Sequence, residues 1–230
     1  MGSRGLFVTG TDTGVGKTVV ACALVRELRR AGLDVGVLKA VETGVGPAGP
    51  LDATALREAA EGVDSLEEVC PLRFALPAAP NVAARHEGGT VDLDRARRAF
   101  GQLASRHDVV VVEGAGGLLV PITDDANMAD LAADLDLPLV VVARAALGTI
   151  NHTLLTLSEA GRRQLTVAGV VISHSDGPLS DADEANLGYL RERLGELLLG
   201  EIPPLQQGEV PAPAAIRIAD LVERLAGSPA

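Results

Sequence analysis

Short apolar runs rich in β-branched residues alternate with longer amphipathic stretches along most of the chain. This alternation predicts βαβ units, in which parallel strands form a sheet that helices cover on both faces. Strands are expected near Gly5–Thr9, Val35–Lys39, Val109–Val112, Leu139–Val142 and Val167–Ile172, with a shorter one near Leu197–Leu199. Helices are expected over Lys17–Ala31, Ala53–Glu61, Leu93–Arg106, Met128–Asp134, Ile150–Arg163 and Asp181–Leu194, with a last one after Ala214. The pattern therefore indicates an α/β fold, with a single three-layer α/β/α domain over residues 1–230 and a mainly parallel sheet.

Two segments interrupt this alternation. Thr43–Leu51 and Cys70–Thr90 are rich in Gly, Pro and Ala, and apolar strands resume after each of them. We interpret both as surface loops of one domain, and long ordered loops are often functional. The strand Val35–Lys39 is expected to lie beside the first strand.

A glycine-rich turn directly follows the first predicted strand. It reads Gly10-Thr11-Asp12-Thr13-Gly14-Val15-Gly16-Lys17-Thr18 and opens into a helix. Such a turn directs backbone N–H groups and the positive end of a helix dipole at an anion, as a triphosphate requires. Lys17 would bridge the β- and γ-phosphates, and the Thr18 hydroxyl would bind Mg²⁺. Thr11 stands where the strict pattern has Gly, so this is a variant Walker A motif. An ordinary strand-to-helix turn is the weaker alternative.

Three charged residues outside this loop are candidates for the same site. Glu113 follows the buried run Val109–Val112, so its carboxylate should reach the crevice at the carboxyl ends of the strands and bind Mg²⁺. Asp52 is a second candidate metal ligand, although a helix N-cap before Ala53 fits it equally well. Lys39 ends a strand and is placed either near the γ-phosphate or in solvent.

The composition and charge of the chain argue against several classes of function. The net charge of -11 argues against a nucleic-acid partner, and no apolar run is long enough to span a membrane. Without an export signal, Cys22 and Cys70 are expected to be buried thiols in a reducing cytoplasm. His86, His107 and His174 have no partner at metal-ligand spacing, and His152 stands at a helix start where capping or packing explains it.

Five motifs, in order along nearly the whole chain, resemble the dethiobiotin synthetases, which are P-loop NTPases. Besides the glycine-rich turn, they are Lys39-x-Val41-x-Thr43-Gly44, Val112-Glu113-Gly114-Ala115-Gly116-Gly117, Gly148-x-Ile150-Asn151-His152 and Gly200-Glu201-Ile202-Pro203. Each motif alone is weak evidence for this family, but the five motifs together are specific for it.

The resemblance implies a homodimeric enzyme that uses ATP, Mg²⁺ and CO₂ to close the ureido ring of dethiobiotin on 7,8-diaminopelargonic acid. It implies catalytic roles for Lys39 and Lys17, and a metal site of Thr18, Asp52 and Glu113. The nucleotide would be bound by Gly14, Val15, Gly16, Lys17, Thr18, Val19, Asp52, Glu113, Gly114, Ala115 and Gly116. The substrate would contact Thr43, and its carboxylate would lie at a partner subunit's Gly148, Thr149, Ile150 and Asn151, a helix start suited to anions.

The sequence departs from the family pattern where the base should bind. Many members have Asn-Asp after the fifth strand, where this chain has Ser173-His174. Asn presents a donor and an acceptor in one plane, which Ser cannot reproduce. Pro203, Pro204 and Leu205 could still line a base pocket. Gly14 and Ala40 also stand where members often have an acid and Pro.

Three other classes of nucleotide-binding protein fit the sequence less well. A partitioning ATPase typically has Lys where Asp12 stands and adds a membrane or DNA contact. An amide-forming ligase of the cobalamin type would carry a glutaminase domain. A GTPase would need an Asn-Lys-x-Asp base reader, which the sequence lacks.

Overall fold

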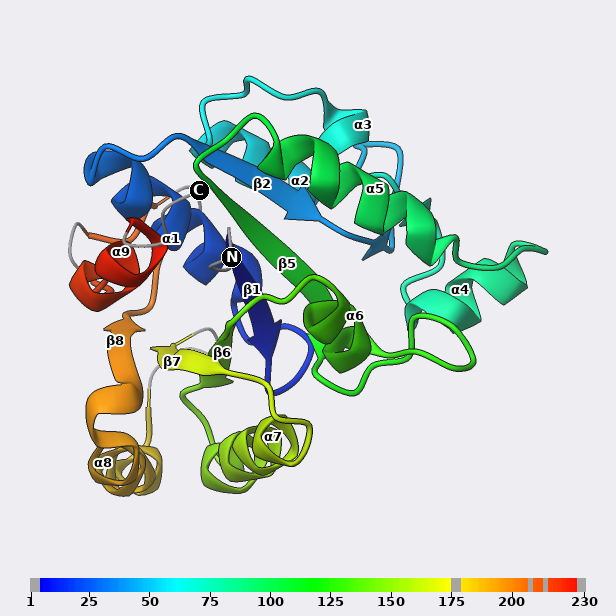
Figure 1. Ribbon diagram of the computed structural model, residues 1–230. Coiled ribbons are helices and arrows are strands. Elements are labelled where there is room, and N and C mark those ends of the chain that lie inside the picture. Colours follow the sequence, from blue (N-terminus) through cyan, green and yellow to red (C-terminus); the bar gives the residue numbers. More distant parts are fainter. Residues whose placement is uncertain (1–4, 175–178, 207–208, 213–214, 227–230) are drawn as a thin grey trace.

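The computed structural model describes residues 5–174, 179–206, 209–212 and 215–226, without the side chains of 220, 223, 224 and 226. Six parallel strands form the main sheet in the order β2-β5-β1-β6-β7-β8 (Figure 1). These strands are β1 Gly5–Gly10, β2 Val35–Lys39, β5 Val109–Gly117, β6 Leu139–Arg144, β7 Val167–Ser173 and β8 Leu198–Ile202. The predicted mainly parallel sheet is confirmed.

Helices cover both faces of this sheet, because successive strand residues point to opposite sides. One core contains Leu6 and Val8 with residues of α1 (Lys17–Arg30), α2 (Leu51–Ala59) and α9 (Ala219–Ala226). The other contains Phe7 with residues of α5 (Leu93–Ala104), α6 (Met128–Asp134), α7 (Thr149–Arg162) and α8 (Asp181–Leu194). The three-layer arrangement is therefore also confirmed.

The prediction that Val35–Lys39 lies beside the first strand was wrong. β5 lies between β1 and β2, and the second strand occupies the edge of the sheet. The apolar run Val109–Val112 is buried on both faces, which suits a central strand better than an edge one. The register sets Lys39 of β2 opposite Glu113 of β5. The two candidate site residues are thus brought together by the strand order that the pattern did not predict.

The segment Cys70–Thr90, expected to be a loop, contains regular structure. β4 (Arg73–Phe74) pairs in parallel with β3 (Glu42–Thr43), and α4 (Pro80–His86) follows. Pro80 occupies the first helical turn, where its missing N–H costs nothing. These elements are too short for a periodic pattern to reveal them, as is α3 (Leu66–Val69).

Several boundaries differ slightly from the prediction. β5 continues to Gly117, and β8 begins after the short 3₁₀ turn Gly195–Leu197. Cys22 and Cys70 are both free and buried, as expected. No helix in the part of the chain described above has the length and apolar character needed to cross a membrane.

Candidate active site

The turn between β1 and α1 is built to bind an anion. Gly14 and Gly16 have φ of 75° and 87°, in the left-handed region that glycine tolerates. Gly16 is the N-cap of α1, with no side-chain cap and no acidic residue in the first turn. The first N–H groups of the helix are therefore available to a ligand, together with the positive end of the helix dipole.

Lys17, at the start of α1, is buried beside this turn. Its ammonium donates to the carbonyl oxygen of Asp12 at 2.9 Å. Burial lowers the pKa of Lys17 to about 8, although the nearby Glu113 carboxylate works against the shift. A phosphate group beside Lys17 would favour its charged form.

Lys39 joins two carboxylates at the carboxyl ends of the strands. Its Nζ lies 2.6 Å from Glu113 Oε1 and 2.7 Å from Asp52 Oδ2, and Glu113 is fully buried. Burial alone would lower the pKa of Lys39, but the Glu113 and Asp52 carboxylates raise it above its ordinary value. Burial opposes the charge of Asp52 too, yet Lys39 holds the pKa of Asp52 below its usual range. The alternative of Lys39 in solvent is wrong.

The alternative assignment of Asp52 as a helix N-cap is also wrong. α2 begins at Leu51 with Pro50 as its N-cap, so Asp52 lies inside the first turn and its carboxylate faces Lys39. A proline N-cap has no side-chain acceptor, and none caps this helix locally. Asp52 therefore remains available to the site.

The donor set suits a hard divalent cation. Thr18 Oγ1 donates to Glu113 Oε1 at 2.9 Å, which brings a hydroxyl and a carboxylate of the expected metal site together. Glu113 Oε2 is buried and has no hydrogen-bond partner among the described residues. An orphaned buried carboxylate oxygen is costly unless a ligand or ion completes it. Oxygen ligands of this kind are those that Mg²⁺ prefers.

These groups line one cleft of about 340 Å³. Its lining residues are Thr13, Gly14, Gly16, Lys17, Thr18, Val19, Lys39, Val41, Glu42, Thr43, Asp52, Glu113, Ala115 and Gly116. Most of the predicted phosphate, metal and catalytic residues are therefore gathered together. The predicted Val15 and Gly114 are not lining residues, and the side chain of Val15 belongs to the hydrophobic core. Glu42 also lines the cleft, although it was not predicted, because the motif around Lys39 leaves its position unspecified.

The predicted base contacts lie at the carboxyl ends of β7 and β8. Ser173 is 3% exposed, and the N–H of His174 donates to the carbonyl oxygen of Ile202 at 3.0 Å. His174 Nε2 is 3.2 Å from Glu201 Oε2, and Arg191 donates to both oxygens of Glu201. Pro203 and Pro204 are exposed, and Leu205 is half-buried. Glu201 therefore holds the His174 imidazole in place, and Arg191 in turn holds Glu201.

The start of α7 forms a separate feature. Gly148 is its N-cap with φ 90°, without a side-chain cap or an acidic residue in the first turn. Thr149 Oγ1 is buried and has no partner in the described part of the chain. Gly148, Ile150 and Asn151 line a cavity of about 480 Å³ with Leu147, Leu154, Leu155 and Asn186. This helix start does not line the cleft that contains Lys39.

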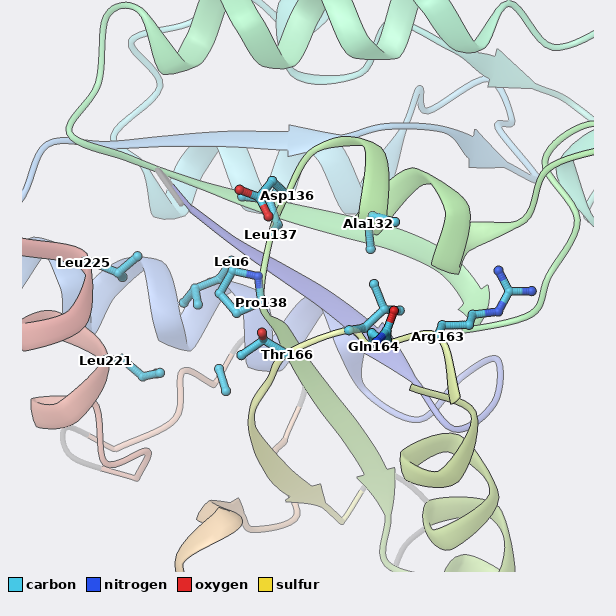
Figure 2. A pocket seen from close by; sticks show the side chains of 13 residues that line it. Leu6, Ala132, Asp136, Leu137, Pro138, Arg163, Gln164, Thr166, Leu221 and Leu225 are labelled. Carbon is cyan, nitrogen blue, oxygen red and sulfur yellow. The ribbon is translucent and has the colours of Figure 1, made fainter. Parts of the chain in front are cut away.

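A further cavity, of about 390 Å³, lies at the amino ends of β1, β6 and β7 (Figure 2). Leu6, Leu137, Pro138, Leu221 and Leu225 supply apolar walls. The guanidinium of Arg163, at its border, is paired with Asp130 and Glu159. Ligands of open parallel sheets bind at the opposite, carboxyl ends of the strands, so we do not assign the active site here.

Comparison with known sequences identifies close relatives. The profile of a family described as an AAA domain matches residues 4–212. An ATP-dependent dethiobiotin synthetase BioD of Anaeromyxobacter dehalogenans is 55% identical, over 84% of this chain and 89% of the relative. The enzymes of the same name from Bacillus licheniformis and Thermodesulfovibrio yellowstonii are 42% and 40% identical, each over 88% of this chain and 87% and 90% of the relatives.

Comparison with solved structures supports the fold. A MinC:MinD cell division protein complex of Aquifex aeolicus superposes with a TM-score of 0.57 at 15% identity, over 99% of this chain and 97% of that one. A ParA family ATPase of Chlorobium tepidum gives a TM-score of 0.53 at 14% identity, over 89% and 86%. At this identity the likeness shows a shared P-loop fold alone. The sequence relatives and the phosphate-binding loop together show that the chain belongs to the family of ATP-dependent dethiobiotin synthetases.

Proposed function

We propose that the protein closes the ureido ring of dethiobiotin from 7,8-diaminopelargonic acid, CO₂ and ATP. One amine adds to CO₂ and gives a carbamate with release of a proton. A carbamate oxygen then attacks the γ-phosphorus of ATP and displaces ADP. The second amine attacks the carbamate carbon, loses its proton and displaces phosphate. The observation that carries this proposal is the cleft in which a phosphate-binding loop, two lysines and the carboxylates of Asp52 and Glu113 meet.

The triphosphate would lie on the backbone between Gly14 and Thr18. The uncapped start of α1 supplies N–H donors there, and Lys17 supplies a positive charge. Lys17 would exchange the Asp12 carbonyl oxygen, 2.9 Å away, for phosphate oxygens. Gly114, Ala115 and Gly116 would border the phosphates on the β5 side.

Thr18, Asp52 and Glu113 would hold Mg²⁺, which when bound would neutralise charge on the phosphates. The orphaned Glu113 Oε2 and the hydrogen bond of 2.9 Å from Thr18 to Glu113 support this assignment. The ammonium of Lys39 lies against both carboxylates. Lys39 would turn from the carboxylates toward the carbamate and the transferring phosphoryl group, where Lys17 assists it.

We propose that the active enzyme is a homodimer in which each site uses two chains. Thr43, in the cleft, would contact the diamine end of the substrate. The uncapped start of α7, with Thr149 Oγ1 buried and unpartnered in the described structure, suits the substrate carboxylate. Because that helix start lies outside the cleft of its own chain, a partner would supply it. The exposed Leu147 and Leu155 beside it offer apolar surface for the contact.

Steady-state turnover tests the reaction. The purified protein should release phosphate from ATP only when both the diamine and bicarbonate are present. Labelled bicarbonate should be recovered in a product whose mass equals the diamine plus CO₂ minus water. Phosphate release that does not depend on the diamine would overturn the proposal.

Mixed dimers test the shared site. Lys39→Ala disables one chain's cleft, and Asn151→Glu places a negative charge at the start of α7, where it repels a carboxylate without harming the helix. Each variant alone should be inactive, and heterodimers should regain activity because one site keeps both wild-type halves. A fully active monomer, or verified heterodimers without activity, would contradict the shared site.

A further inference from the structure

Glu42 occupies a place in the cleft that the reaction outlined above does not use. It belongs to β3, between Lys39 and Asp52 in the sequence, and only 7% of it is exposed although it lines the cleft. Its backbone N–H donates to the carbonyl oxygen of Leu72 at 2.9 Å, which fixes the strand. Burial of a carboxylate requires hydrogen-bond donors that compensate its charge.

Those donors are the first N–H groups of α2. Glu42 Oε1 accepts from the N–H of Asp52 at 3.1 Å, and Oε2 accepts from the N–H of Ala53 at 3.0 Å. These are the groups that an N-cap side chain normally satisfies, and Pro50 cannot do so. Glu42 therefore caps α2 from a different element of the fold.

Several other helices of the described chain cap themselves locally, whereas α1 and α7 have no side-chain cap. Ser65, Asn127 and Ser180 each accept from their own helix in a capping box. Compared with these three helices, only α2 has its first turn capped by a residue of another element, Glu42 of β3. The residue whose N–H is held in this way, Asp52, is the one whose carboxylate lies 2.7 Å from Lys39.

We propose that Glu42 is a positioning residue, which fixes the first turn of α2 so that the Asp52 carboxylate faces the cation site of the cleft. This inference rests on the proposed role of Asp52 in metal binding. Both oxygens of Glu42 are engaged by the helix, so Glu42 acts through Asp52 and not by contacting the substrate. Residues that orient a metal ligand from behind are typically worth ten- to a hundredfold in metal affinity.

The test separates capping from charge by restoring the cap locally. Glu42→Ala removes both the cap and the charge. In Glu42→Ala with Pro50→Ser, a serine hydroxyl at the N-cap can accept from the same N–H groups, because residue 50 already has the extended backbone of an N-cap. Pro50→Ser alone is the matched control, and Glu42→Gln keeps the size of the side chain if the alanine variant does not fold.

Mn²⁺, a spectroscopic substitute for Mg²⁺, should be titrated by paramagnetic resonance with a non-hydrolysable ATP analogue present. Glu42→Ala is expected to weaken Mn²⁺ binding about tenfold, and the double variant should recover most of it. Hydrogen exchange should show faster exchange of the Asp52 and Ala53 amides in Glu42→Ala, and slower exchange again in the double variant. Should Glu42→Ala not fold, Glu42→Gln must weaken Mn²⁺ binding and regain it with Pro50→Ser.

Unchanged Mn²⁺ binding in Glu42→Ala, or weak binding that Pro50→Ser does not restore, would overturn the positioning role. Glu113→Gln distinguishes this failure from that of the metal assignment itself. If Glu113→Gln and Asp52→Asn both leave Mn²⁺ binding intact, the proposed metal site is wrong and the role of Glu42 falls with it. If they weaken it while Glu42→Ala does not, only the inference about Glu42 is wrong.

Discussion

At each end of β2 and β5 a nitrogen-bearing side chain lies between two carboxylates, but the two arrangements have different consequences. At the carboxyl ends, Lys39 from β2 lies between Glu113 of β5 and Asp52 of α2. At the amino ends, His107 just before β5 lies 3.0 Å from both Asp34, just before β2, and Asp64, which follows α2. β2, β5 and α2, with the residues next to them, thus supply one residue each to two triads: Lys39, Glu113 and Asp52 at the carboxyl ends, and Asp34, His107 and Asp64 at the amino ends.

The triads differ in what they leave unsatisfied. Asp64 also accepts from Arg106, which in turn bonds Glu68, so the triad at the amino ends is closed by protein groups. Each ring nitrogen of His107 lies within hydrogen-bond distance of a carboxylate oxygen. At the other end, Glu113 keeps a buried oxygen without a partner among the described residues, and an open cleft reaches it. Both ends therefore contain buried charged groups. In the described part of the chain, only the carboxyl end combines an unsatisfied carboxylate oxygen with an open cleft, and this combination is what distinguishes the candidate active site.

The largest expected effect separates the triads by activity. Lys39→Met keeps most of the side-chain volume but removes the charge that would stabilise the carbamate and the phosphoryl group. We expect kcat/KM to fall by about 10³, roughly 4 kcal/mol of transition-state stabilisation. His107→Gln should remain within a few-fold of the wild type. Steady-state kinetics with all substrates varied would measure both, and similar losses in the two variants would remove the distinction.

The triads should also respond differently to metal. Without Mg²⁺, Lys39→Met leaves the buried Glu113 without its counter-ion, and the free energy of unfolding should fall by about 4 kcal/mol. Millimolar Mg²⁺ with ADP should restore much of that loss, because a cation that binds only the folded state stabilises it. Urea unfolding with and without the metal checks this. A loss that Mg²⁺ does not reduce would place the cation elsewhere.

At the closed triad, metal should have no such effect. His107→Ala leaves Asp64 buried with one remaining partner, Arg106, so we expect a loss of about 3 kcal/mol. The same urea measurements should give that value with and without Mg²⁺. Rescue by the metal would show that the amino-end triad can also bind a cation.

Much of the fold could be predicted from the local sequence pattern, whereas the two triads could not. The strands and main helices were predicted because their periods are properties of adjacent residues, and the phosphate-binding loop because its motif is contiguous. His107 received no role because its partners lie 73 and 43 residues away. Glu42 was missed for the same reason, since the cap that it provides spans ten residues and two elements. Lys39 was placed at a strand end, but its position opposite Glu113 depends on β5 lying beside β2.

A smaller effect tests how tightly the closed triad is packed. A methyl group added at Gly36 of β2 would come within 2.6 Å of the His107 ring. Gly36→Ala should therefore push the imidazole away from its carboxylates and cost about 1–3 kcal/mol, the usual range for overpacking. In the double variant with His107→Ala the cost of Gly36→Ala should largely disappear. Additive losses in this cycle would mean that the two residues do not interact.

The smallest expected effect concerns a third charged array, formed by His174, Glu201 and Arg191 at the carboxyl ends of β7 and β8. It lies at the carboxyl ends of the strands, where Ser173 stands at the position at which the family pattern has the planar amide expected to read adenine. A rotating hydroxyl can satisfy several base edges, so most nucleotide affinity should come from the phosphates in the loop Gly14–Thr18.

We therefore expect CTP and GTP to support turnover within about tenfold of ATP, which corresponds to about 1.4 kcal/mol of discrimination. Values of kcat/KM for the four triphosphates, at saturating diamine and bicarbonate, decide the question. A site that hydrogen-bonds one base edge rejects the others strongly, because a mismatch leaves buried polar groups unpaired. Ser173→Asn should accordingly sharpen the preference for ATP. A preference of several hundredfold in the wild type, lost in His174→Ala, would instead assign the reading of adenine to the imidazole that Glu201 holds in place.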